Sequence, residues 1–129
     1  MQYLTAEEIV AIHDRVLEET PGSFGVRDEN LLRSIAEKPR ASFGGAEQFP
    51  TLFLKAAVYL ESLATYHVFV DGNKRTAITV VGVFLHINAY ELELDIEKTE
   101  EFILAAAQKQ ISLTEIAEWL EKHAKRKGE

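Results

Sequence analysis

Residues 51–88, TLFLKAAVYLESLATYHVFVDGNKRTAITVVGVFLHIN, contain two apolar segments that are separated by a short polar stretch. Thr51 can cap a helix over residues 51–64, and a second helix is expected over about 75–88. Both segments are apolar nearly all round, which is typical of helices at the centre of a bundle. Small residues would let these helices approach their neighbours closely, namely Ala56, Ala57, Ala64, Ala77 and Gly82.

Four further helices are indicated on either side of this central pair. Residues 5–8, Thr-Ala-Glu-Glu, form a capping box before apolar positions with helical spacing. Asp28 can cap a second helix that ends before Pro39. Apolar residues at 102, 103 and 106 indicate another, and a second capping box at residues 112–115 introduces the last. The sequence therefore predicts an all-α fold, a compact bundle of about six helices.

Two stretches lack helical periodicity. Residues 40–50 contain Phe43 and the pair Gly44 and Gly45, and we expect an exposed flap or hairpin near the polar stretch that joins the two central helices. Residues 90–96 alternate strictly between apolar and polar side chains, which favours a short extended segment with one face covered.

Composition limits the possible functions. With 129 residues and 47% hydrophobic composition, the chain is expected to form one domain over residues 1–129. A net charge of −7 disfavours direct nucleic-acid binding, which depends on many contacts from cations to phosphates. The sequence has no cysteine, no apolar run long enough for a membrane span and no secretory signal, so we expect a soluble, cytoplasmic protein.

The polar stretch at residues 67–75, HVFVDGNKR, has the composition of a phosphate-handling site. His67 can accept a proton at neutral pH, and the Asp71 carboxylate is a suitable ligand for Mg²⁺. Gly72 can adopt a positive φ at the turn into the next helix. Phe69 is expected to point inward and hold the loop on the core.

Lys74 and Arg75 follow Asn73 at the expected start of that next helix. Cations are unfavourable at a helix N-terminus unless an anion binds there, and the free backbone N–H groups of such a terminus also attract anions. These residue types are therefore consistent with phosphoryl or nucleotidyl transfer to a hydroxyl.

Simpler interpretations of the same residues remain open. A histidine followed by an aspartate and two cations also occurs in surface turns, and Lys74 and Arg75 can simply be solvated. His67 and Asp71 have no obvious third ligand for zinc nearby. The three remaining histidines are expected to be structural or exposed, namely His13, His86 and His123.

The stretch resembles the core motif of the Fic/Doc family, H-x-F-x-[D/E/N]-[G/A]-N-[G/K]-R, and every motif position is matched. Lys74 is the form seen in the Doc (death-on-curing) branch. The resemblance extends to residues 4–9, to residues 12–14 and to the flap around residues 43–45. It implies a Fic/Doc-like helical bundle.

The resemblance also implies a role for each matched position. His67 would be the general base toward an acceptor hydroxyl, and Asp71 would act with Mg²⁺ and the nucleotide phosphates. The phosphate and nucleotide ligands would be Gly72, Asn73, Lys74 and Arg75, with Phe69 as the core anchor. AMP-transferring members of the family have glycine in place of Lys74 and an arginine in place of Ile78. These differences favour the inverted nucleotide pose of the Doc branch, in which the γ-phosphoryl group is transferred.

The implied function is that of the toxin of a toxin–antitoxin module. It would be a serine/threonine protein kinase that uses ATP and Mg²⁺ to phosphorylate a threonine of elongation factor Tu and thereby arrests translation. The flap residues Phe43, Gly44 and Gly45 would contact the target. The alternatives are an adenylyltransferase of the Fic type and a non-catalytic module that binds phosphate or a peptide.

Regulation would come from a separate protein. Self-inhibiting Fic proteins have [S/T]-x-x-x-E-[G/N], whereas here Gly25 occupies the serine or threonine position before Glu29 and Asn30. The resemblance therefore predicts an antitoxin whose disordered C-terminal tail folds into a groove of this domain.

Overall fold

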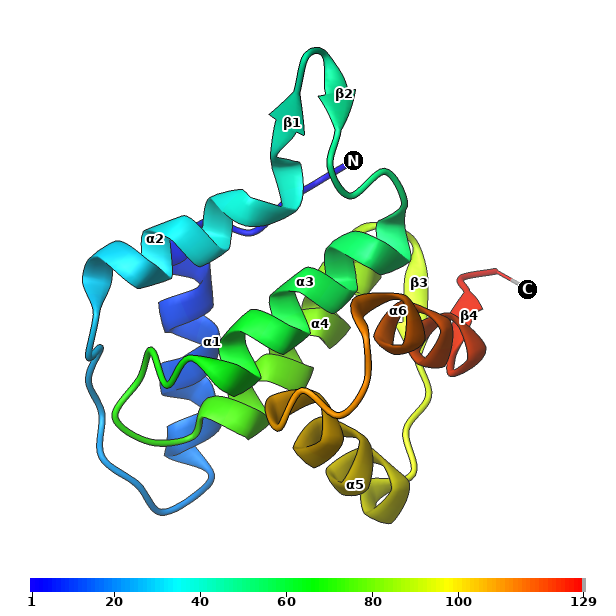
Figure 1. The fold of residues 1–129 in the computed structure, drawn as a ribbon. Coiled ribbons are helices and arrows are strands. Elements are labelled where there is room, and N and C mark those ends of the chain that lie inside the picture. Colours follow the sequence, from blue (N-terminus) through cyan, green and yellow to red (C-terminus); the bar gives the residue numbers. More distant parts are fainter. Residues whose placement is uncertain (129) are drawn as a thin grey trace.

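The computed structural model describes residues 1–128, and Glu129 of the predicted domain lies outside them. Within this range the chain forms six α-helices, a short 3₁₀ turn and two small two-stranded sheets (Figure 1). The helices are α1 (Ala6–Glu18), α2 (Glu29–Glu37), α3 (Leu52–Thr65), α4 (Asn73–Ile87), α5 (Ile96–Ala107) and α6 (Leu113–Lys122). The strands are β1 (Ser42–Phe43), β2 (Ala46–Glu47), β3 (Tyr90–Leu92) and β4 (Ala124–Arg126). The predicted bundle of six helices is confirmed.

The helix boundaries follow the capping residues that the sequence indicates. Thr5 and Ser112 each form a complete capping box, before α1 and α6 respectively. The side chains of Asp28 and Thr51 accept hydrogen bonds from backbone N–H groups in the first turns of α2 and α3. Asp95 caps α5 in the same way, although we had no prediction of where that helix begins. Local side-chain hydrogen bonds therefore determine where most helices begin.

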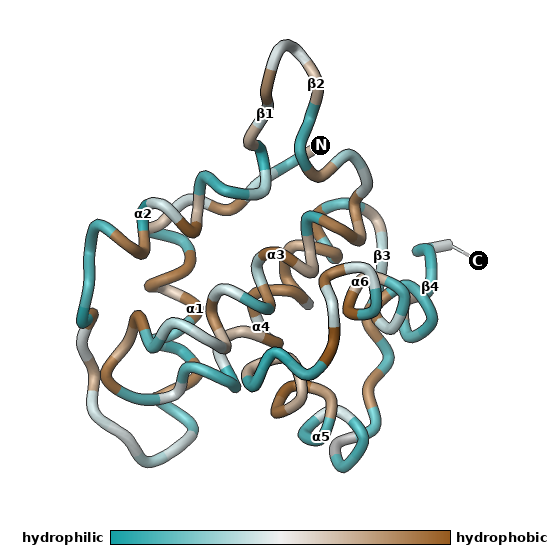
Figure 2. The backbone as a smooth tube through the Cα atoms, viewed as in Figure 1, coloured by the Kyte–Doolittle hydropathy of each residue, from teal (hydrophilic) through white to brown (hydrophobic). Residues whose placement is uncertain are grey.

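The central pair predicted from residues 51–88 is α3 and α4. These antiparallel helices pack against each other, with α1 and α2 on one side and α5 and α6 on the other (Figure 1). Figure 2 shows that apolar residues dominate α3 and α4, whereas the outer helices alternate between hydrophobic and hydrophilic positions. The four predicted small contact residues Ala56, Ala57, Ala64 and Ala77 are all at most 1% exposed. None of the helices in residues 1–128 combines the length and apolar character that crossing a membrane requires.

Gly82 differs from its prediction. A Cβ added at this position would meet no heavy atom within 4 Å, so the glycine does not allow a close helix contact. It lies instead on the open side of α4, where it borders a surface depression with His86 and Leu92. The prediction was wrong because the buried residues of α4 lie on one face of the helix and Gly82 is not among them, namely Thr76, Ala77, Val80, Val81, Phe84 and Leu85.

The extended segment predicted at residues 90–96 is present but shorter. β3 pairs antiparallel with β4, so that Tyr90 lies opposite Arg126 and Leu92 opposite Ala124. The segment then turns into α5, and the side chain of Ile96 lies outside the described residues. No sequence pattern indicated β4, which covers one edge of β3.

The predicted flap is a two-stranded hairpin, β1–β2, whose turn is formed by Gly44 (φ 55°) and Gly45 (φ 83°). Two successive residues with positive φ are typical of a tight two-residue hairpin turn. Its position relative to the motif differs from our expectation. The hairpin precedes α3 whereas residues 67–75 follow it, so the length of this helix, about 20 Å, separates them (Figure 1).

A buried lysine fastens this hairpin to the first turn of α3. Lys55 is 1% exposed, and its Nζ donates hydrogen bonds to the backbone carbonyls of Pro39 (3.1 Å) and Phe49 (2.6 Å) and to Glu47 Oε1 (3.0 Å). All three protons of the ammonium group therefore have an acceptor. A buried charge is tolerated in this way only when its hydrogen-bonding capacity is satisfied.

We predict that Lys55→Met lowers the free energy of unfolding by about 2–4 kcal/mol, because it leaves buried carbonyls without a donor. Urea unfolding monitored by circular dichroism measures the change. Lys38→Met is the matched control, because Lys38 is exposed and its replacement should cost less than about 0.5 kcal/mol. Equal effects of the two substitutions would show that the Lys55 contacts do not stabilise the hairpin.

Candidate active site

The motif occupies the loop between the two central helices, and His67 lies at its start. α3 ends at Thr65, Tyr66 is its C-cap residue, and His67 follows with a φ of 48°. This left-handed conformation commonly terminates a helix, but glycine is the usual residue there because a Cβ makes it unfavourable. The His67 side chain is exposed, and among residues 1–128 no hydrogen bond to its ring is found. The imidazole is therefore accessible and free to accept a proton.

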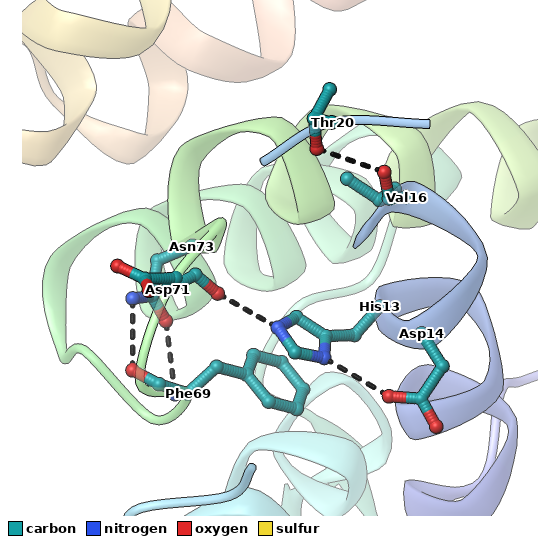
Figure 3. A network of polar contacts seen from close by, with 7 residues as sticks. All are labelled: His13, Asp14, Val16, Thr20, Phe69, Asp71 and Asn73. Carbon is teal, nitrogen blue, oxygen red and sulfur yellow. Dashed lines mark hydrogen bonds and ion pairs between the residues drawn. The ribbon is translucent and has the colours of Figure 1, made fainter. Parts of the chain in front are cut away.

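Phe69 holds the loop on the core, as predicted. Its side chain is fully buried, and its ring stacks on the imidazole of His13 from α1, with centroids 3.8 Å apart and planes inclined by 7°. His13 is itself 1% exposed, and its Nε2 donates a hydrogen bond to the backbone carbonyl of Asp71 at 2.7 Å (Figure 3). The predicted structural character of His13 is confirmed. Its contact with the Asp71 carbonyl, which connects α1 to the motif, was not predicted, because residues 13 and 71 are far apart in the sequence.

Asn73 closes the loop from the other side. Its Oδ1 accepts a hydrogen bond from the backbone N–H of Phe69, and its Nδ2 donates one to the Phe69 carbonyl, both at 3.0 Å (Figure 3). The side-chain amide of Asn73 thus pairs with both backbone groups of Phe69, as a neighbouring strand would in a β-sheet. These bonds use both polar atoms of the side chain to fix the loop, while the role of phosphate ligand stays a prediction.

Gly72 has the positive φ that the sequence predicted, 76°, and is the N-cap residue of α4. A Cβ at this position would come within 3.2 Å of Leu17 Cδ2 and 3.8 Å of His13 Nε2. Glycine is therefore required both by the backbone conformation and by the close approach of α1. The space that it leaves is filled by protein atoms of α1.

The segment at residues 22–27 lies beside the motif. Val26 and Phe69 form an antiparallel bridge, with hydrogen bonds from Arg27 N–H to the Val68 carbonyl (2.8 Å) and from Val70 N–H to the Gly25 carbonyl (3.1 Å). This segment, and not the β1–β2 hairpin, is the chain that lies next to the loop. Gly22 and Gly25 indicate an irregular backbone in this segment, but they do not indicate that the segment contacts the motif.

Asp71 is exposed and partly engaged by that segment. Its Oδ2 accepts a hydrogen bond from the backbone N–H of Ser23 at 2.8 Å, whereas Oδ1 has no partner among residues 1–128. Since Mg²⁺ in phosphate-binding enzymes is often held by one or two carboxylates together with the phosphates, a single free carboxylate oxygen fits this ion. No group of three or more potential metal-binding side chains was found in the described residues.

Lys74 and Arg75 are exposed in the first turn of α4. Neither forms an ion pair with an acidic side chain in the part of the chain that the structure describes. Both cations therefore add to the positive end of the helix dipole without compensation, in a turn that contains no acidic residue. The arrangement combines an exposed imidazole, a carboxylate oxygen without a partner among the described residues, and two exposed cations at the ends of one loop.

The predicted flap residues lie away from the motif, at the opposite end of α3. Phe43 is 74% exposed and, with Gly44 and Gly45, lies at the tip of the β1–β2 hairpin. A target that touches this tip and the motif together would have to extend along the whole of α3. Phe24, which is 58% exposed on the segment beside the motif, is closer to the loop along the paired backbone.

We predict that His13→Phe destabilises the protein by about 1–3 kcal/mol, because the ring stack can persist while the partly buried hydrogen bond to the Asp71 carbonyl is lost. Chemical denaturation gives the stability, and hydrogen exchange of the Gly72 and Asn73 amides reports the loop. His86→Phe is the control, since His86 is 58% exposed and bonds only to exposed side chains. Unchanged exchange in His13→Phe would show that the loop does not depend on this contact.

Comparison with known proteins agrees with this geometry. The model of the Fic/DOC family matches residues 3–85, which include α1 to α3, all but the last two residues of α4, and the entire motif. The chain is 40% identical to "Toxin Doc" of Mycolicibacterium smegmatis over 98 residues, covering 74% of this chain and 75% of the relative. It is 30% identical to "Protein kinase doc" of Escherichia phage P1 over 120 residues, covering 93% and 94%. The chain therefore belongs to the Fic/Doc family.

Proposed function

We propose that this protein is a Doc-type toxin that transfers the γ-phosphoryl group of ATP to a threonine hydroxyl of elongation factor Tu and so arrests translation. The observation that most supports the proposal is the exposed His67 imidazole at one end of the motif loop, with Lys74 and Arg75 at the other end, in the first turn of α4. Neither cation forms an ion pair within residues 1–128. The relatives named "Toxin Doc" and "Protein kinase doc" support both the toxin and the kinase parts of it.

His67 has the role of general base. Its ring accepts the proton of the attacking hydroxyl as the new oxygen–phosphorus bond forms and the bond to the leaving ADP oxygen breaks. The exposed position suits this role, because a protein substrate has to reach the imidazole directly. The backbone of His67 is in the left-handed conformation, and its side chain is exposed. This conformation lowers the stability of the free protein.

Lys74 and Arg75 supply the electrostatic part of the reaction. They lie where the helix dipole is positive, so charge on the phosphates is stabilised by side chains and by free backbone N–H groups together. Asp71 would hold Mg²⁺ through Oδ1, and the ion would neutralise phosphate charge when bound. The hydrogen bond from Ser23 orients the carboxylate for this purpose.

A toxin of this kind requires a partner protein that inhibits its activity. We propose a cognate antitoxin whose disordered C-terminal tail folds on this domain, and a cytoplasmic location where elongation factor Tu is present. The relatives with toxin names support the existence of such a module.

We predict that His67→Ala and His67→Gly both reduce phosphate transfer to elongation factor Tu at least a hundredfold while ATP still binds. His67→Gly should be no less stable than the wild type, because relief of about 1 kcal/mol of left-handed strain offsets the entropy cost of glycine. Transfer of γ-labelled phosphate and the urea midpoint are the two measurements. Transfer that survives in both variants would rule out His67 as the base.

Lys74→Gly tests the choice between phosphoryl and AMP transfer. We predict that γ-phosphate transfer falls at least tenfold, because one of the two cations at the α4 N-terminus is lost. Parallel reactions with α-labelled and γ-labelled ATP distinguish the products. If the wild type transfers the α-label and not the γ-label, the protein is an adenylyltransferase and the kinase proposal fails.

A further inference from the structure

α5 ends in a backbone conformation that suits glycine, and the chain has a lysine there. Gln108 is the C-cap residue, and Lys109 follows it with a φ of 56°. The N–H of Lys109 donates a hydrogen bond to the Ala106 carbonyl at 3.1 Å. The N–H of Gln110 donates one to the Ala105 carbonyl at 2.9 Å, which completes a Schellman motif. Because a Cβ is unfavourable at this position, the lysine indicates a role for its side chain.

The side chain of Lys109 contacts Tyr66, the C-cap residue of α3. Its Nζ donates a long hydrogen bond of 3.4 Å to the Tyr66 hydroxyl and lies 5.3 Å from the centroid of the Tyr66 ring. The next residue after Tyr66 is His67, which also has a positive φ. The ends of α3 and α5 therefore meet at the start of the motif loop, and each has a non-glycine residue in the left-handed conformation.

This pair of side chains has unused hydrogen-bond donors. Lys109 is exposed and forms no ion pair with an acidic side chain within residues 1–128. Tyr66 is 42% exposed, and its oxygen accepts from Lys109 while no acceptor for its own hydrogen is found among the described residues. Since the chain has a net charge of −7, most of its surface repels acidic groups, and an unpaired lysine creates a local exception.

We propose that Lys109 and Tyr66 bind a carboxylate of the protein substrate close to the acceptor hydroxyl, so that the enzyme prefers a hydroxyl with an acidic neighbour. The inference rests on the proposed function and adds to it a specificity determinant outside the motif. A carboxylate offers two oxygens, one for the Lys109 ammonium and one for the Tyr66 O–H. Neither residue takes part in the bond changes of phosphate transfer.

The position of the pair favours the acceptor over the phosphate donor. Lys74 and Arg75 lie at the end of the motif loop where α4 begins, and free backbone N–H groups there also attract phosphate. Lys109 contacts the other end of the loop, through the residue that precedes the proposed base. A general base has to lie next to the hydroxyl that it deprotonates. The protein segment that carries this hydroxyl therefore passes His67 and its neighbours.

Steady-state transfer of γ-phosphate to elongation factor Tu at saturating ATP separates the KM for the protein from kcat. Lys109→Gln removes the charge, Lys109→Arg keeps it, and Lys109→Gly removes both the charge and the strained Cβ. Lys98→Gln is the matched control, because Lys98 is an exposed lysine in the first turn of the same helix. Isothermal titration of the full chain gives the affinity for Mg·ATP, and urea unfolding gives the stability.

We expect Lys109→Gln and Lys109→Gly to raise the KM for the protein about tenfold at low salt, with kcat and ATP affinity within twofold of the wild type. Tyr66→Phe should raise this KM about threefold, because it loses one neutral donor. Lys109→Arg and Lys98→Gln should behave as the wild type does. The urea midpoint of Lys109→Gly should be no lower than that of the wild type, so its higher KM would not reflect lost structure.

An unchanged KM in both Lys109→Gln and Lys109→Gly, with transfer retained, would overturn the inference and leave the proposed function intact. Weaker ATP binding without a change in this KM would also overturn it, because Lys109 would then act on the phosphates. If the wild type transfers no γ-phosphate to elongation factor Tu, the proposed function fails and the inference fails with it.

Discussion

The stack of Phe69 on His13 is the contact on which the rest of the site depends. It buries the middle of a loop whose other side chains are polar, and it is the point where α1 meets the connection between α3 and α4. Two sets of hydrogen bonds then fix the backbone, one from His13 to the Asp71 carbonyl and one from the Asn73 amide to Phe69. With the backbone held in this way, the loop can expose His67, Lys74 and Arg75 without losing its shape.

The same loop shows a conflict between stability and chemistry. A glycine at the end of α3 would suit the left-handed conformation, and the chain has histidine there instead. The first turn of α4 would suit acidic residues, and it has two cations. Both choices cost stability in the free protein, and both place a reactive or charged group where a nucleotide and a hydroxyl can meet. Local rules of this kind are expected to fail at functional sites.

The sequence predicted most of what depends on local interactions. The caps at Thr5, Asp28, Thr51 and Ser112, the apolar character of α3 and α4, and the positive φ of Gly72 are all properties of a few neighbouring residues. The burial of Phe69 was also predicted, since an aromatic side chain in a loop between two core helices is stabilised by packing against that core. The candidate site at residues 67–75 could also be predicted, because its charged and polar residues are neighbours in the sequence.

The errors concern contacts between residues far apart in the chain. β4 pairs with a strand more than 30 residues away, and the role of His13 depends on its contact with Asp71. The segment at residues 22–27 reaches the motif through a bridge from Val26 to Phe69. Such pairings are decided by tertiary packing, which no window of sequence contains.

The central claim is that His67 and the two cations of α4 act on the same nucleotide, with the terminal phosphate toward the imidazole. Nuclear magnetic resonance of the histidine rings, with Mg·ATP and Mg·ADP added in turn, tests it directly. The account predicts that ATP moves the His67 ring signals much more than ADP does, that both nucleotides move the backbone amides of Lys74 and Arg75, and that the exposed His86 ring is unaffected. His67 signals that stay in place when ATP shifts those amides would contradict it.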